Sequence, residues 1–206
     1  MSEDPSHYSV LILAAGESSR MGSPKPLLPL GRKNFISHIL SNPFLQRNDI
    51  HPHVVLGFEP ENILPYIPKH IDFSVNAQYE QGRTSSVQCG LRELPPHVSG
   101  FFMLPVDCPL ITPDVFEAVM NAFVDERSIC IPSFENKRGH PPLIGKAYGN
   151  EIMQLGMDEP LRMLYQRHEE YILHVPVVTD SILHNINTPE DYRAVLTAYE
   201  HGLGER

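Results

Sequence analysis

Residues 8–29 read YSVLILAAGESSRMGSPKPLLP, and this stretch decides the fold. It opens with an apolar run that ends at Ala14, of the kind that forms a strand buried inside a parallel sheet. A loop follows in which Gly16 lets backbone N–H groups approach an anion closely, while Arg20 and Lys25 supply positive charge. A strand, a glycine loop and two cations together predict a triphosphate-binding site.

Two better-known phosphate-binding loops do not fit this stretch. A P-loop requires GxxxxGK[ST], whereas Lys25 follows Pro24, and Gly16 and Gly22 are too far apart. A dinucleotide-binding fingerprint requires three glycines at the start of a helix, but the prolines after Gly22 disfavour a long helix. The remaining alternative is an ordinary glycine turn carrying two solvated charges.

Short apolar runs alternate with helical stretches along the rest of the chain. This alternation predicts an α/β fold with a mostly parallel sheet covered on both faces, and ligands at the carboxyl ends of its strands. The predicted strands are 9–14, 53–56, 72–76, 100–104, 128–131, 142–144 and 171–175. The predicted helices are 34–40, 61–66, 85–94, 113–124, 145–153, 160–166 and 189–200. Because no linker or repeat interrupts the pattern, we expect residues 1–206 to form one domain.

Composition excludes several classes of partner. The net charge is −9 and no Lys/Arg cluster is present, so we expect no nucleic-acid binding. No apolar run is long enough to cross a membrane, and residues 1–7 do not resemble a signal peptide. Cys89, Cys108 and Cys130 are odd in number and lack metal-like spacing, which favours a reducing, cytoplasmic location.

A single carboxylate follows the predicted strand 100–104. Asp107 would lie just past the carboxyl end of a central strand, where ligands bind in such sheets. Mg²⁺ prefers one or two carboxylates together with phosphate oxygens and water, so Asp107 suits a metal that bridges a triphosphate. The structural alternative is an Asp that only shapes the turn before Pro109.

The sequence resembles the MobA-like NTP transferases, and within them most closely the molybdenum cofactor cytidylyltransferases. The resemblance begins with LAAG at 13–16, RMG at 20–22 and Lys25, and it recurs along nearly the whole chain. It implies a Rossmann-like three-layer sandwich and Mg²⁺-dependent transfer of a nucleoside monophosphate from an NTP to an acceptor phosphate. It implies catalytic roles for Arg20, Lys25 and Asp107. The implied nucleotide-binding residues are Leu13, Ala14, Ala15, Gly16, Arg20, Lys25, Ser85, Ser86 and Asp107.

Metal binding is implied at two segments. Asp107-Cys108-Pro109 resembles the Asp-x-Pro metal motif of the family. Residues 184–191 resemble the segment before the last helix, where the cytidylyltransferases usually carry Asp-Ile-Asp-Thr-Pro, but here Asn185 and Asn187 replace both aspartates. An Asn oxygen can bind Mg²⁺ without adding charge, so Asn187 is the expected second ligand. The alternative is an Asn that caps the helix at Pro189.

Two further segments resemble family motifs on the base and acceptor sides. Residues 82–86 resemble Gly-x-Ser-Ser-Ser, which implies that Ser85 and Ser86 bind the nucleotide. Thr84 or Ser85 could instead serve only to cap the helix. Residues 138–141 match Arg-Gly-His-Pro, which implies that His140 contacts the acceptor, with a structural turn histidine as the alternative.

The nucleotide and acceptor are predicted from the same resemblance. Ala14 and Ala15 before Gly16 are typical of the cytidylyltransferase form, and a methyl beside the loop can exclude a bulkier base, so CTP is favoured. Asn185 and Asn187 point back towards guanylyl- or sugar-nucleotide transferases. The implied acceptor is molybdopterin, and the implied partner is a molybdoenzyme. Transfer to a sugar phosphate, or a non-catalytic chaperone that binds molybdenum cofactor, remain the other interpretations.

Overall fold

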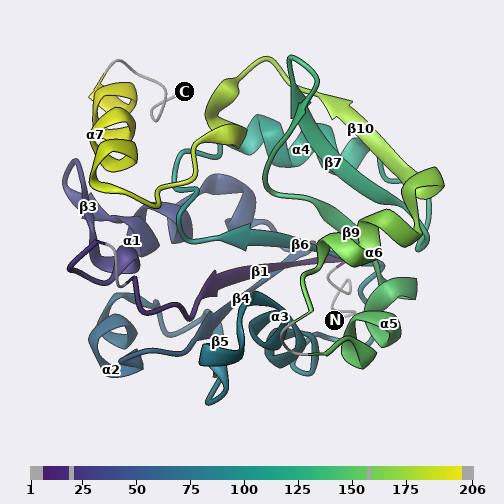
Figure 1. The fold of residues 1–206 in the computed structure, drawn as a ribbon, viewed down its shortest axis with the longest axis horizontal. Helices are drawn as coiled ribbons and strands as arrows, with labels where there is room; N and C mark the ends of the chain where they lie inside the picture. The colour runs from purple at the N-terminus through teal and green to yellow at the C-terminus, as the bar shows by residue number, and fades with distance from the viewer. Residues whose placement is uncertain (1–6, 19–20, 157–158, 201–206) are drawn as a thin grey trace.

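The central strand is the apolar run that opens the chain. The computed structural model describes residues 7–18, 21–156 and 159–200. In it, β1 (Tyr8–Ala14) pairs in parallel with β4 (Ile50–Leu56) and with β6 (Gly100–Pro105). Leu13 lies opposite Pro105 in this register. The loops that follow β1 and β6 therefore start side by side, at one edge of the sheet (Figure 1).

The sheet has eight strands, and most neighbouring pairs are parallel. Its order is β10-β7-β9-β6-β1-β4-β5, with β8 paired to β7. β9 (Leu143–Gly145) runs antiparallel to both β6 and β7 (Ile129–Phe134). The remaining strands are β5 (Asp72–Val75), β8 (Lys137–Arg138) and β10 (Ile172–Pro176). A separate two-stranded sheet joins β2 (Pro29–Leu30) to β3 (Lys33–Asn34).

Helices cover both faces, as the apolar strands require. Side chains alternate along β1, so Val10 and Ile12 pack on one face and Leu11 and Leu13 on the other. The first face carries α1 (Phe35–Leu40), α2 (Pro60–Ile63), α4 (Pro113–Asn121) and α7 (Pro189–Ala198). The second carries α3 (Arg83–Leu91), α5 (Gly149–Gln154) and α6 (Arg162–Arg167). The predicted three-layer α/β fold is confirmed.

All seven predicted strands are present. The elements that the sequence did not predict are strands of two residues and short 3₁₀ turns. The chain also forms 3₁₀ turns at Lys25–Leu27, Pro43–Gln46, Leu64–Tyr66, Tyr79–Gln81, Lys146–Tyr148, Glu169–Tyr171 and Asp180–Leu183. The sequence missed β2, β3 and β8 because two residues carry no periodicity. The expectation that Thr84 or Ser85 caps a helix was wrong, since α3 starts at Arg83 with Gly82 at the cap position.

Helix α7 begins at Pro189, as predicted. Thr188 accepts a hydrogen bond from the Asp191 N–H, and the Asp191 carboxylate accepts one from the Thr188 N–H, which forms a capping box. Thr112 occupies the cap position of α4 but makes no side-chain cap. Across the described ranges, no helix has both the length and the apolar character needed to cross a membrane.

Candidate active site

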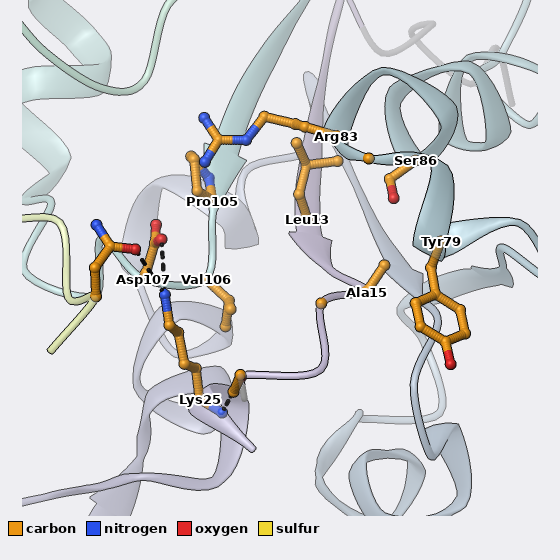
Figure 2. A pocket seen from close by; sticks show the side chains of 13 residues that line it. Leu13, Ala15, Lys25, Tyr79, Arg83, Ser86, Pro105, Val106 and Asp107 are labelled. Atoms are coloured by element: carbon orange, nitrogen blue, oxygen red, sulfur yellow. Dashed lines mark hydrogen bonds and ion pairs between the residues drawn. The ribbon is translucent and has the colours of Figure 1, made fainter. Parts of the chain in front are cut away.

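A cavity of about 410 Å³ opens where β1 and β6 end (Figure 2). Among the predicted site residues, it collects Leu13, Ala15, Gly16, Lys25, Ser86, Asp107 and Asn187. The remaining lining residues are Ser18, Tyr79, Gly82, Arg83, Pro105 and Val106. The parallel pairing of β1 with β6 thus brings the glycine loop and the Asp107 turn to one place.

The glycine loop is held from behind by the chain after β4. The carbonyl oxygen of Ala15 accepts a hydrogen bond from the Phe58 N–H at 3.0 Å. Gly57 leaves no space there, because a Cβ would lie 2.5 Å from that oxygen and 2.8 Å from the Ala15 Cβ. The Ala15 methyl is therefore fixed as part of the cavity wall.

Ser18 closes the loop onto Lys25. Its hydroxyl accepts a hydrogen bond from the Lys25 N–H at 2.8 Å, and its carbonyl accepts one from the Met21 N–H at 2.8 Å. These bonds fix the backbone from which the lysine side chain starts. Arg20, the other predicted cation, lies outside the described residues, so its role stays a prediction.

Three side chains from distant segments converge in the cavity. The Lys25 ammonium lies 3.4 Å from the Asp107 carboxylate and 2.9 Å from the Asn187 amide oxygen (Figure 2). Two hard oxygen donors that share one ammonium also suit a divalent cation once the ammonium moves to a phosphate. The described residues contain no group of three or more His, Cys, Asp or Glu placed to hold a metal. A metal here would depend on ligand phosphates and water to complete its coordination.

The Asp107 turn is fastened to the segment before α7. The Ile186 N–H donates a hydrogen bond to the Asp107 carbonyl at 3.0 Å, and the Cys108 thiol donates one to the Asn185 amide oxygen at 2.7 Å. Burial and the adjacent Asp107 carboxylate raise the pKa of Cys108, so the thiol keeps its proton. Since Thr188 caps α7, the Asn187 side chain is not used as a cap and faces Lys25 instead.

Two predicted nucleotide-binding side chains do not line the cavity. Ala14 is buried on the α1 face of the sheet, with Ile12. The Ser85 hydroxyl is within hydrogen-bond distance of the Gly82 carbonyl at 2.8 Å and of the Gln78 carbonyl at 3.0 Å. Ser86 does line the cavity. Only backbone groups of Ala14 and Ser85 are left to contribute to a ligand site.

The sequence missed six lining residues, of which Arg83 matters most. It is the first residue of α3 and lines the 410 Å³ cavity (Figure 2). It also lines a neighbouring cavity of about 480 Å³. The signal for it was present, because Arg83 follows Gly82 inside the serine-rich motif and departs from the usual family residues. Ser18, Tyr79 and Gly82 carried no comparable signal.

His140 does not line the 410 Å³ cavity. It lines the 480 Å³ cavity and a further one of about 280 Å³, and Tyr165 lines both as well. Gly139 positions it, because a Cβ at Gly139 would collide with the backbone of Ile182. Burial, with a smaller effect of Arg83, lowers the pKa of His140 to about 4, so its ring is neutral at pH 7.

One ring nitrogen of His140 lacks a hydrogen-bond partner in the described part of the chain. Nδ1 is buried and has no hydrogen-bond partner among the described residues. A buried polar atom without a partner costs free energy unless something satisfies it. The 480 Å³ cavity shares Leu13, Arg83 and Pro105 with the 410 Å³ cavity, so the two cavities are neighbours.

Comparison with protein families gives a match over most of the chain. The family model described as "MobA-like NTP transferase domain" matches residues 10–171. A "Probable molybdenum cofactor guanylyltransferase" from Bacillus cereus is 24% identical over 200 residues, which are 91% of this chain and 94% of that protein. The "Bifunctional protein GlmU" of Mycolicibacterium paratuberculosis is 35% identical over 120 residues, 53% of this chain but only 24% of that protein. The matched region therefore spans about a quarter of GlmU.

Solved structures of the same fold exist. An rv0371c homologue from Mycobacterium sp. strain JC1 superposes with a TM-score of 0.82 at 23% identity, covering 95% of this chain and 98% of that one. Rv0371C of Mycobacterium tuberculosis H37Rv in complex with manganese gives a TM-score of 0.76 at 20% identity, covering 93% and 99%. At these identities the likeness concerns the fold alone.

Proposed function

The chain belongs to the MobA-like NTP transferase family, and from that premise we propose that it transfers a nucleoside monophosphate from an NTP to an acceptor phosphate. The observation that carries the proposal is the meeting of Lys25, Asp107 and Asn187 in one cavity beside the glycine loop. CTP is the favoured nucleotide and a molybdopterin-type phosphate the favoured acceptor. Three cysteines without disulfides fit a reducing, cytoplasmic setting.

Phosphate binding falls to the cations and the loop. Lys25, Arg83 and the backbone N–H groups near Gly16 would neutralise the triphosphate, with Arg20 as a further candidate. Lys25 would exchange its contacts with Asp107 and Asn187 for phosphate oxygens. The two oxygens it leaves would hold Mg²⁺. When bound, that ion would neutralise and align the phosphate oxygens.

The reaction needs no activated nucleophile. An acceptor phosphate oxygen forms a bond to the α-phosphorus while the bond to the bridging oxygen of the β-phosphate breaks, and that electron pair leaves with pyrophosphate. Phosphate is already anionic at neutral pH, so catalysis rests on alignment and charge stabilisation. The neutral His140 ring would hydrogen-bond the acceptor and orient it towards the nucleotide.

Selection for CTP would rest on Ala15. Its methyl lines the cavity and cannot retreat, because Gly57 and Phe58 pack behind it. A fixed methyl leaves less room for a purine than glycine would.

GTP is the second candidate nucleotide. The Bacillus cereus relative, named a guanylyltransferase, matches nearly the full length of both chains. A sugar phosphate would be the alternative acceptor.

Pyrophosphate release tests the proposal directly. CTP and GTP are each supplied with Mg²⁺, with and without molybdenum cofactor, and a sugar 1-phosphate replaces the cofactor in a third series. Release from CTP only when cofactor is present supports the favoured reaction. Release from GTP alone would identify the protein as a guanylyltransferase instead. Binding without any release would overturn catalysis and favour a cofactor chaperone. Asp107→Asn serves as the inactive control.

A further inference from the structure

A further cavity, of about 750 Å³, lies apart from the 410 Å³ cavity proposed for the nucleotide (the nucleotide cavity) and from the two cavities that His140 lines. Buried apolar side chains on the α1–α4 face form part of its lining, among them Ile39, Leu104 and Phe116. Among the described residues, none lines both this cavity and any of the three cavities of the candidate active site. The proposed reaction therefore leaves it without a role.

The charged side chains that line this cavity are positive. Arg32 and Lys33 contribute to its lining, together with His38, whose pKa burial and the nearby Lys33 lower. No described lining residue is acidic, although the chain carries 25 Asp and Glu and a net charge of −9. Neither Arg32 nor Lys33 forms an ion pair with a described carboxylate, and the Lys33 ammonium donates instead to the Ser41 hydroxyl at 2.7 Å. Two uncompensated cations above an apolar floor favour a ligand with both an anionic and an apolar part.

The walls connect this cavity to the active site. The segment 108–113 forms one wall, and it directly follows Asp107. Asn42 fastens this wall by donating a hydrogen bond to the Ile111 carbonyl at 2.8 Å. Tyr199 forms another part of the lining just past the end of α7, whose first turn follows Asn187. Both expected metal ligands thus stand at the start of segments that reach this cavity.

We propose that the 750 Å³ cavity is a binding site for a small organic anion, a phosphate or carboxylate carried on an apolar body, and that its occupancy changes nucleotide affinity at the active site. The charged group binds Arg32 and Lys33, and the apolar body packs on the buried floor. Binding at this site does not depend on the proposed reaction. Coupling between the two sites must be reciprocal, so the nucleotide changes the affinity for the anion by the same factor.

Phenyl phosphate is the probe, and titration calorimetry on the full-length protein is the measurement. We expect it to bind more tightly than inorganic phosphate or phenol, since each lacks one half of the recognised chemistry. The double variant Arg32→Glu/Lys33→Glu should weaken binding about tenfold or more. The matched control Lys69→Glu/Arg92→Glu makes the same charge change at exposed positions outside the cavity lining and should bind normally.

Lys25→Ala separates the two sites. If phenyl phosphate binding survives in Lys25→Ala but is lost in the Arg32/Lys33 variant, the probe occupies the proposed cavity. The opposite pattern places it in the nucleotide cavity and overturns the proposal, as does the absence of binding. In the wild type, saturating phenyl phosphate should shift the CTP dissociation constant at least threefold, and no shift would overturn the coupling.

Discussion

Three polar groups of the nucleotide cavity have hydrogen-bonding partners within the protein, whereas a polar atom of His140, beside the other two cavities, has none. In the first, Lys25, Asp107 and Asn187 satisfy one another through an internal ion pair and a hydrogen bond. In the second, a buried nitrogen of His140 has no partner in the described chain. In the first region the three polar groups are already paired, so Lys25 must leave Asp107 and Asn187 before it can bind a ligand. The second lacks a contact that a ligand could supply.

The largest effect should come from Asp107→Asn in the nucleotide cavity. Removing the carboxylate deletes the charge expected to hold the metal, so turnover should fall on the order of 100-fold or more. The melting temperature should move by only a few degrees, because the Asp107 backbone carbonyl keeps its bond to Ile186. Pyrophosphate release and thermal unfolding measure the two quantities. Normal turnover would show that Asp107 does not hold the metal.

Lys25→Ala should separate catalysis from metal binding. Turnover should fall about 100-fold, since a phosphate contact is lost. Mn²⁺ affinity without nucleotide should rise severalfold, because no ammonium competes for Asp107 and Asn187. Electron paramagnetic resonance of free Mn²⁺ gives that affinity, with exposed Lys69→Ala as the control. Unchanged Mn²⁺ affinity would mean that the lysine and the metal occupy different points.

His140→Ala tests the unsatisfied region. Loss of a neutral hydrogen bond to the acceptor should raise the acceptor KM about tenfold, on the basis of about 1–1.5 kcal/mol per bond. The nucleotide KM should stay constant, because His140 does not line the nucleotide cavity. Steady-state kinetics with each substrate varied in turn will measure both KM values. Equal effects on both KM values would contradict the division into two regions.

Ala15→Gly should change nucleotide choice more than rate. Without the fixed methyl, the ratio of kcat/KM for GTP to that for CTP should rise severalfold. Competition between the two nucleotides in one reaction gives this ratio directly. Ala14→Gly is the neighbouring control, because that methyl is buried on the opposite face. Similar shifts in both variants would point to loop flexibility rather than to the wall.

A further effect of the His140 region concerns stability and pH. The pKa of His140 is about 4 in the folded protein, below its ordinary 6.5, so the unfolded chain binds the proton more tightly. Stability should therefore be constant above about pH 6.5 and decrease as pH falls from there towards 4, by at most about 1.4 kcal/mol per pH unit for one proton. In His140→Asn, urea unfolding at pH 7, 6 and 5 should show a shallower decrease.

The sequence predicted the arrangement of the nucleotide cavity better than its details. The strand segments and the position of Asp107 just past the end of β6 follow from apolar runs and from the rule that ligands bind at carboxyl strand ends. The two predicted side chains that do not line the cavity, those of Ala14 and Ser85, are turned away for physical reasons. Period two along β1 puts Ala14 on the face of Ile12, and the start of α3 at Arg83 turns Ser85 back onto Gly82.

Long-range geometry could not be read from local patterns. Lys25 is 82 positions from Asp107 and 162 from Asn187, and only the completed sheet determines that they meet. The same holds for the 750 Å³ cavity, whose walls come from α1, the segment after Asp107 and Tyr199. Arg32 and Lys33 read as ordinary solvated charges until these walls are assembled.

Gly57 limits how the nucleotide preference of this site can change during evolution. It does not itself line the nucleotide cavity, yet it limits what position 15 can hold, because a Cβ at position 57 would lie 2.8 Å from the Ala15 Cβ. A larger side chain at position 15 can only grow into the space used by the base. In a library that varies positions 15 and 57 together, selection for nucleotide use should retain glycine at 57 and only glycine or alanine at 15. A residue remote from the ligand would then restrict the evolution of nucleotide preference to one direction, towards larger bases.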